Sequence, residues 1–168
     1  PRKPDPVVLG SVIGMNTVEH CNALIDDARA KGAKLLCGGK ATSTLMAATV
    51  LDHVTPAMRI YHEETFGPVK CVVRVNGVDE AVACANDNEY GLSSAVFGAD
   101  IARAFNVARR IESGICHVNG PTVHDEAQMP FGGVKGSGMG RFGGKAGVAE
   151  FTELRWITLQ TTPRHYPF

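Results

Sequence analysis

Apolar residues return at two different intervals along this chain, and the interval predicts where helices and strands lie. Between residues 16 and 31 they recur every three or four positions, which is the spacing of one side of a helix. Asn16 or Thr17 can cap the start of this helix, and Gly32 can end it. We expect one side of the helix to face the core. That side consists of Val18, Cys21, Leu24, Ile25 and Ala28.

The same two intervals predict the other elements. We expect strands at residues 34–37, 47–54, 69–75, 93–97, 115–118 and 155–159. We expect helices at residues 79–85, at 145–150 and between Asp100 and Gly114, where the aspartate supplies the cap and the glycine the stop. Strands that alternate with helices are typical of βαβ units. The sequence therefore predicts an α/β fold with a mostly parallel sheet.

Charge and cysteine content narrow the class of protein. Seventeen acidic residues balance seventeen basic ones, so no net charge favours nucleic acid or a membrane surface. The five cysteines are an odd number and widely spaced, which indicates reduced thiols in a cytoplasmic protein and no metal site. No apolar run approaches the length of a membrane span, and the proline-rich residues 1–6 resemble a connector rather than a signal sequence.

The stretch from Met129 to Gly144 is almost half glycine, which needs a reason because glycine costs the folded state entropy. Residues 138–143 match the Gly-x-Gly-x-x-Gly spacing of a dinucleotide site, but the segment before them is loop and no acidic residue ends the next strand. A flexible linker is the alternative, which the anchoring side chains Pro130, Phe131 and Phe142 oppose. We interpret the stretch as a crossover that passes close to another backbone.

A second unusual stretch joins two adjacent carboxylates, Glu63 and Glu64, to Phe66 and a Gly-Pro turn. A carboxylate can accept two hydrogen bonds from a vicinal diol, and an aromatic ring can cover a planar base. Glu64 and Phe66 are therefore a candidate contact pair for a ribose and its base. A solvated helix end is an equally good interpretation of this stretch alone.

A third stretch, from Asn119 to Met129, follows a predicted strand directly. Loops at the carboxyl ends of parallel strands carry ligand sites in α/β proteins. An ordinary surface turn is the alternative, since the Asn-Gly-Pro sequence at its start would form one unaided.

Together these stretches resemble an NAD(P)-dependent aldehyde dehydrogenase. The family pattern Glu-Glu-x-Phe-Gly-Pro matches residues 63–68, and Tyr-Gly-Leu-x-x-x-Val-Phe matches residues 90–97. Val-Asn followed by Pro-Phe-Gly-Gly-x-Lys-x-Ser-Gly-x-Gly-Arg matches residues 118–141, and Thr-Glu matches residues 152–153. Residues 164–168 resemble the branch that acts on aromatic aldehydes such as vanillin, benzaldehyde or salicylaldehyde.

The resemblance implies a place in a larger enzyme. Residues 1–159 would be the C-terminal part of the catalytic domain, a three-layer α/β/α structure, and residues 160–168 a part of the oligomerisation element. The enzyme would be a homo-oligomer, a dimer or tetramer, that uses NAD or NADP. In the family a cysteine thiolate attacks the aldehyde and a glutamate activates water, and both residues lie upstream of the part that this chain matches. We therefore expect the chain alone to be inactive, and Cys37, Cys71, Cys84 and Cys116 to be small core residues.

The resemblance also assigns supporting roles. Glu64 would hold the hydroxyls of the nicotinamide ribose, and Phe66 would contact the nicotinamide side. The aldehyde tunnel would be lined by Val123, His124 and Phe131, with His124 adding polarity for a ring hydroxyl. Arg141 and Glu153 would order the subunit interface through ion pairs, although a solvated surface pair is the alternative. Many members carry Glu where this chain has Phe142, so no proton relay through that position is expected.

A second hypothesis comes from a different class of protein. The chain would then be a self-standing oligomerisation or binding module without chemistry of its own. The sequence upstream of Pro1 separates the two hypotheses, because a cysteine-bearing segment there favours the enzyme and a start codon favours the module.

Overall fold

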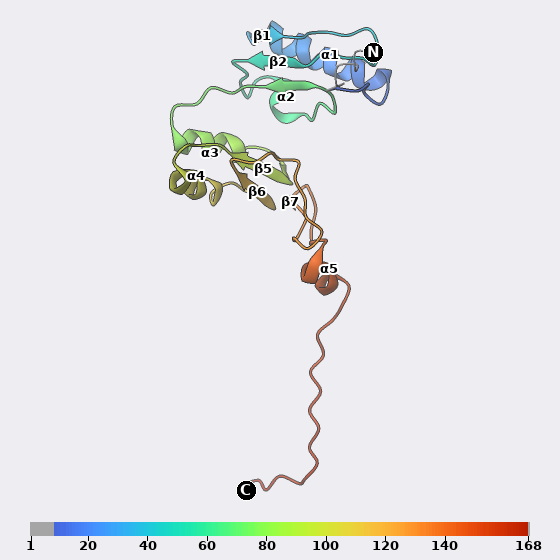
Figure 1. Ribbon diagram of the computed structural model, residues 1–168, viewed down its shortest axis with the longest axis vertical. Coiled ribbons are helices and arrows are strands. Elements are labelled where there is room, and N and C mark those ends of the chain that lie inside the picture. Colours follow the sequence, from blue (N-terminus) through green and yellow to red (C-terminus); the bar gives the residue numbers. More distant parts are fainter. Residues whose placement is uncertain (1–8, 168) are drawn as a thin grey trace, which may run out of the picture. The chain divides into compact units, whose positions relative to one another are not determined.

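The computed structural model describes residues 9–167, so the predicted connector at residues 1–6 lies outside the described part. The chain divides into two compact units, Pro1–Gly77 and Val78–Phe168. Each unit contains its own helices and small sheets (Figure 1). Among the described residues, no helix combines the length and apolar character needed to cross a membrane.

The first unit packs two helices with a three-stranded sheet. Its elements in chain order are α1 (Met15–Ala30), β1 (Lys34–Cys37), β2 (Thr49–Asp52), α2 (Arg59–His62) and β3 (Val69–Cys71). The strands lie in the order β1-β2-β3, with β1 antiparallel to β2 and β2 parallel to β3. The first pair is antiparallel because the chain from residue 38 to 48 turns back without a helical crossover.

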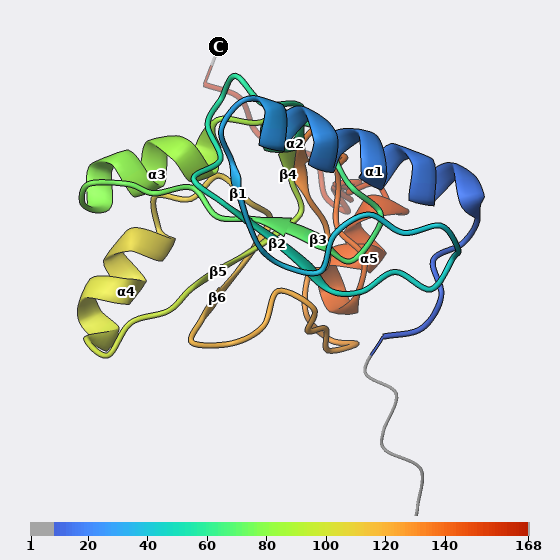
Figure 2. The ribbon, with the colours of Figure 1, turned by 90° about the horizontal axis from the view of Figure 1, so that it is seen from above.

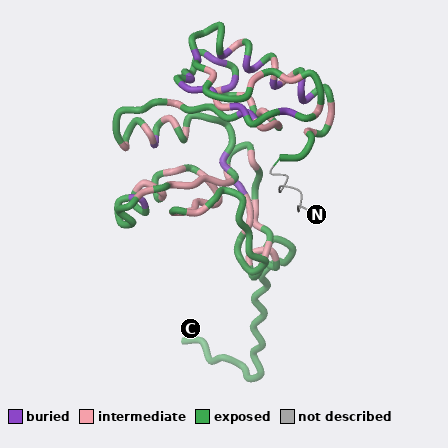
Figure 3. The backbone as a smooth tube through the Cα atoms, turned by 45° about the horizontal axis from the view of Figure 1, so that its top comes forward, coloured by how far each residue is buried: buried purple, intermediate pink, exposed green. Residues whose placement is uncertain are grey.

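The apolar side of α1 forms the core of this unit, as its spacing predicts. Val18, Cys21, Leu24, Ile25 and Ala28 are all at most 1% exposed, and the cluster that they join also holds residues from β2 and β3. Most of the buried positions, which are purple in Figure 3, belong to this unit. Burying that much apolar side chain is the main source of stability for a domain of this size.

The predicted caps of α1 are partly wrong. The helix begins two or three residues earlier than the predicted caps imply, and Gly14 occupies the N-cap position without a side-chain hydrogen bond, so Asn16 and Thr17 lie inside the helix. Gly32 does end it, with a φ of 103° that a residue with a side chain rarely adopts. Apolar packing therefore fixes this helix more than capping does.

The second unit contains smaller pieces of sheet. Its elements are α3 (Val78–Asn86), β4 (Tyr90–Gly91), β5 (Ser93–Val96), α4 (Ile101–Ala108), β6 (Ile115–Val118), β7 (Val134–Lys135) and α5 (Gly144–Glu150). β5 and β6 are parallel, β4 and β7 are antiparallel, and α4 packs on the β5–β6 pair (Figure 2). Asp100 caps α4 as predicted, since its carboxylate accepts a hydrogen bond of 3.0 Å from the backbone N–H of Arg103.

The α/β class is confirmed, but the described chain has three small sheets of mixed direction instead of one mostly parallel sheet. The strand predicted at residues 155–159 is absent, and Trp156 and Leu159 there are 90% and 86% exposed. An alternating pattern makes a strand only where a neighbour supplies hydrogen bonds, and none does within residues 9–167.

The cysteines are only partly as predicted. Within residues 9–167, none of the five forms a disulfide, which agrees with reduced thiols. Cys37 and Cys71 are exposed, and Cys84 and Cys116 are half-buried, so the prediction that these four are core residues is wrong. Cys21 alone is buried, and burial raises the pKa of its thiol.

The crossover interpretation of the glycine-rich stretch is confirmed. A side chain at Gly114 would collide with the backbone of Gly132, and one at Gly136 would come within 2.9 Å of the Glu89 carbonyl oxygen. Side chains at Gly143 and Gly144 would collide with the carbonyls of residues 128 and 129. The glycines are thus required where this stretch runs against other backbone.

Candidate functional site

In the first unit, one of the two adjacent carboxylates is occupied and the other is free. Glu63 is paired with Arg59, whose Nε and Nη2 donate to its two carboxylate oxygens at 2.7 and 2.9 Å. Those hydrogen bonds hold the pKa of Glu63 below its usual range. Glu64 is exposed. No described residue donates a hydrogen bond to its carboxylate or forms an ion pair with it. Its acceptor oxygens are therefore available to a diol, which fits the predicted ribose contact.

Helix α1 holds the turn that carries Glu64 and Phe66. The His20 Nε2 donates to the Glu64 carbonyl oxygen at 3.0 Å, and the Cys21 thiol donates to the Thr65 carbonyl oxygen at 3.3 Å. A Cβ on Gly67 would lie 2.5 Å from the Cys21 sulfur, so the turn can approach the helix only because Gly67 has no side chain. The turn thus packs directly against α1, the core helix of the unit.

Phe66 has an unusual conformation and an unusual environment. Its φ of 46° lies in the left-handed region, which is a true outlier for a bulky residue, and its side chain is 79% exposed. Local strain that persists in a well-packed surrounding is found mostly at functional positions. The exposed ring fits the predicted contact with a planar cofactor ring.

A cavity of about 380 Å³ lies in the second unit, against β6 and the loop that follows it. Its walls combine apolar and polar side chains, among them Ile115, His117, His124, Met129, Pro130 and Phe131. His124 and Phe131, to which the family resemblance assigns substrate contacts, therefore line one cavity. Val123 does not line it, and its side chain is 91% exposed.

The polar part of this cavity is built around two histidines. The rings of His117 and His124 meet edge to face, with 5.6 Å between their centroids and 90° between their planes. The His124 Nε2 lies 3.5 Å from a carboxylate oxygen of Glu126. Sequence analysis missed His117, although a histidine within an otherwise apolar strand was a signal that could have found it.

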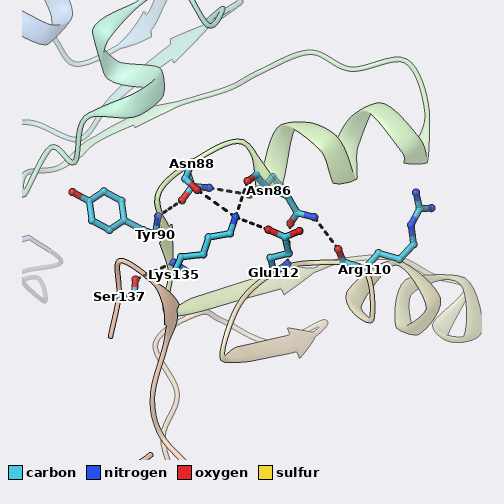
Figure 4. Close-up of polar contacts among 9 residues, drawn as sticks. Asn86, Asn88, Tyr90, Arg110, Glu112, Lys135 and Ser137 are labelled. Atoms are coloured by element: carbon cyan, nitrogen blue, oxygen red, sulfur yellow. Dashed lines mark hydrogen bonds and ion pairs between the residues drawn. The ribbon is translucent and has the colours of Figure 1, made fainter. Parts of the chain in front are cut away.

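Lys135 anchors the middle of the glycine-rich stretch to other segments of the second unit (Figure 4). Its ammonium group donates to the carbonyl oxygens of Asn86 at 2.7 Å and Asn88 at 3.3 Å, and lies 2.7 Å from the carboxylate of Glu112. Next to it, the Ser137 hydroxyl accepts a hydrogen bond of 2.9 Å from the N–H of Gly91. These contacts join segments more than twenty residues apart, so no local pattern could have revealed them.

The backbone of Phe131 is held by hydrogen bonds to a later residue of the same stretch. Its N–H donates to the Phe142 carbonyl oxygen at 2.8 Å, and the Phe142 N–H donates back at 2.7 Å. The glycine-rich stretch therefore folds back on itself, and the backbone of the cavity wall is fixed at both ends.

Arg141 and Glu153 form no ion pair with each other or with any other side chain that the structure describes. The guanidinium of Arg141 donates to the carbonyl oxygens of Gly133 and Gly140 at 2.8 and 2.6 Å, and Glu153 is exposed. Their predicted role at a subunit interface stays a prediction.

Comparison with known proteins decides the family. The sequence pattern of the aldehyde dehydrogenase family matches residues 1–157. The chain belongs to the aldehyde dehydrogenase family. It is 56% identical to a vanillin dehydrogenase of Pseudomonas fluorescens, over 99% of this chain and 34% of that protein. It is 37% identical to a benzaldehyde dehydrogenase of Pseudomonas putida, over 98% of this chain and 34% of that protein.

A solved aldehyde dehydrogenase shares the fold of this chain. The crystal structure of a salicylaldehyde dehydrogenase from Pseudomonas putida G7, complexed with salicylaldehyde, superposes with a TM-score of 0.88 at 52% identity. That match covers 95% of this chain and 33% of the other. The chain thus spans about a third of the length of the aldehyde dehydrogenases that it matches. Crystal structures of other homologues contain NADP or NAD+.

The predicted contacts of this aldehyde dehydrogenase chain fall into two groups. Glu64 and Phe66 lie together on the turn that α1 holds, in the first unit. His124 and Phe131 share the cavity of the second unit, with Val123 on the same loop. Among the described residues, no group of histidine, cysteine or acidic side chains is arranged to hold a metal ion.

Proposed function

We propose that this chain is the C-terminal part of an aldehyde dehydrogenase that oxidises an aromatic aldehyde to the carboxylic acid with NAD or NADP. The observation that carries the proposal is the identity of more than half its residues, over nearly its whole length, to vanillin and salicylaldehyde dehydrogenases. The free carboxylate of Glu64 and the cavity lined by Phe131 and His124 support it independently.

The chain would contribute binding groups to this reaction. A bound nicotinamide cofactor would supply the hydride acceptor that the oxidation of an aldehyde needs. Glu64 would accept hydrogen bonds from the ribose hydroxyls, and Phe66 would contact the nicotinamide side. Val123, His124 and Phe131 would orient the aldehyde, with Phe131 against its ring. Each of these groups positions a reactant, which lowers the barrier without entering the bond-forming step.

The remaining proposals concern the whole enzyme. Residues 1–159 would belong to a three-layer α/β/α catalytic domain, in which the small sheets join strands from the rest of the protein. Residues 160–168 would belong to the oligomerisation element of a cytoplasmic homo-oligomer, with Arg141 and Glu153 at a subunit interface. The exposed apolar side chains at residues 151–159 support burial of this segment in an assembly.

The test has two parts. The gene that encodes this chain is sequenced upstream of Pro1, and the whole protein is purified and assayed with NAD, NADP, benzaldehyde, vanillin and salicylaldehyde. We expect an upstream segment with a reactive cysteine, production of NADH or NADPH, and no turnover by residues 1–168 alone. A whole protein that oxidises none of these aldehydes would refute the proposal and favour a binding module.

The Glu64 contact is tested by substitution in that whole protein. Glu64→Gln keeps the size but weakens the charged acceptor, so we expect KM for the cofactor to rise about tenfold or more. Glu63→Gln is the matched control, because Glu63 is already paired with Arg59. An equal rise in the cofactor KM for both variants would contradict the assignment of Glu64 to the ribose.

A further inference from the structure

One residue that lines the cavity of the second unit has a buried polar atom without a partner. The Nε2 of His117 is covered by the chain's own atoms, yet no described group forms a hydrogen bond with it. Buried polar atoms without partners are rare in folded proteins because they have given up water without replacement. Such an atom at a cavity wall calls for an explanation.

The atoms around His117 suggest what could occupy this place. His117 and His124 contact each other edge to face, and both line the cavity with Phe131, Met129, Pro130 and Ile115. An apolar wall beside two imidazoles suits a flat ring that carries a polar substituent. Asp125 and Glu126 also line the cavity, so negatively charged substituents are disfavoured there.

We propose that His117 and His124 form a hydrogen-bonding end of this cavity for the neutral hydroxyl group of a phenol ring. A neutral imidazole offers one donor and one acceptor, and a hydroxyl can serve either. The inference rests on the proposed function, and it narrows the substrate class to aromatic aldehydes that carry a ring hydroxyl. His117 is then a specificity-determining residue that nothing in the sequence motifs identifies.

His124 lies against the ring of His117 and is itself partly exposed to solvent. Its side chain is 55% exposed, and it lies in residues 119–130, which contain no helix or strand. In this proposal, a turn of His124 away from the ring of His117 makes room beside that ring, and the ligand's hydroxyl replaces the contact between the rings. The 3.5 Å contact with Glu126 gives His124 a charged neighbour in its present position.

The binding test uses the chain of residues 1–168 with 15N-labelled histidine. The probes are the three isomers of hydroxybenzyl alcohol, with benzyl alcohol as reference, because these keep the ring and form no imine with lysine. Ring nitrogen shifts in long-range 1H–15N spectra report hydrogen bonding at each histidine separately. We expect at least one hydroxylated isomer to shift the His117 Nε2 signal and to bind about tenfold more tightly than benzyl alcohol.

Variants test whether the preference for hydroxylated probes comes from the Nε2 of His117. His117→Phe keeps an aromatic ring without a hydrogen-bonding atom and should remove the preference for the hydroxylated probe. His117→Gln keeps a polar atom and should retain part of it, and His165→Phe, in the exposed tail, should change nothing. An equal affinity for hydroxylated and plain probes, a preference that survives His117→Phe, or no binding by any probe would each overturn the inference.

The whole protein separates this inference from the proposed function. There we expect His117→Phe to lower the ratio of kcat/KM for the preferred hydroxybenzaldehyde to that for benzaldehyde by about tenfold. If the wild-type protein oxidises no aldehyde while the chain still binds hydroxylated probes through His117, the proposed function fails and the phenol site stands. If it oxidises both aldehydes and the ratio does not change, the phenol site fails and the proposed function stands.

Discussion

The ammonium group of Lys135 lies 2.7 Å from the carboxylate of Glu112, and the same group closes the C-terminal end of α3 by donating to the carbonyl of Asn86. Lys135 itself has a φ of 55°, a conformation that residues with side chains rarely adopt. One side chain thus ties the glycine-rich stretch to two turns that are distant in the sequence. Phe131, which lines the cavity, is only four residues upstream of this tie.

We predict that Lys135→Met lowers the free energy of unfolding of the second unit by about 1–2 kcal/mol, because two carbonyls and a carboxylate lose a charged donor. Lys145→Met is the control, since Lys145 is exposed, and its effect should stay within about 0.5 kcal/mol. Urea unfolding, monitored through amide hydrogen exchange at Tyr90 and Gly136, measures the change in unfolding free energy for both variants. Equal losses in the two variants would show that the tie contributes nothing.

Gly114→Ala should destabilise the second unit by about 1–3 kcal/mol, because the new Cβ meets the backbone of Gly132 rather than a side chain that can move. Gly120→Ala is the matched control, because its Cβ would lie at an ordinary 3.5 Å from the Cβ of His117. Thermal unfolding monitored by circular dichroism compares them. A wild-type melting curve for Gly114→Ala would mean that the crossover can shift without cost.

The first unit should become less stable in acid because of Asp52. Its carboxylate accepts hydrogen bonds from Arg74 at 2.8 and 2.6 Å, and these are the main reason why the pKa of Asp52 lies far below its usual range. The folded chain therefore binds this proton less readily than the unfolded chain, so the stabilisation is present above about pH 4 and is lost as the pH falls below it.

Unfolding midpoints measured between neutral pH and pH 2 test this. Asp52→Asn should be less stable than the wild type at neutral pH, and the difference should shrink below about pH 4. Asp26→Asn is the control, because Asp26 is half exposed and pairs with Lys40 across a solvated contact of 2.9 Å. A difference between wild type and Asp52→Asn that does not change with pH would contradict the prediction.

Phe66 should carry a conformational cost that a glycine would relieve. Both Phe66→Ala and Phe66→Gly remove the exposed ring, but only glycine adopts a φ of 46° without strain. We predict that the glycine variant is more stable than the alanine variant by about 0.5–1 kcal/mol, after the entropy lost by glycine is subtracted. Chemical unfolding of the first unit gives the comparison, and a more stable alanine variant would exclude strain at this position.

Several features of the fold could be predicted from neighbouring residues alone. The core side of α1, the cap of α4 by Asp100 and the strand at residues 115–118 follow from local spacing, because each needs only apolar periodicity or one side-chain acceptor. The close backbone approach at the glycine-rich stretch was also predictable, since dense glycine has few other physical reasons. The motifs identified the family, as the comparisons confirm.

What the sequence determined by itself is therefore the family, the helical core side and the need for glycine between residues 129 and 144. The structure showed which carboxylate of Glu63 and Glu64 is free, through a local contact, because Arg59 pairs with Glu63 four residues away. It also decided that His117 faces His124, that Lys135 reaches Glu112, and that residues 155–159 form no strand among the described residues. The Lys135 contact and the missing strand depend on distant segments that folding brings together or leaves without a neighbour, and a linear pattern records no such distances.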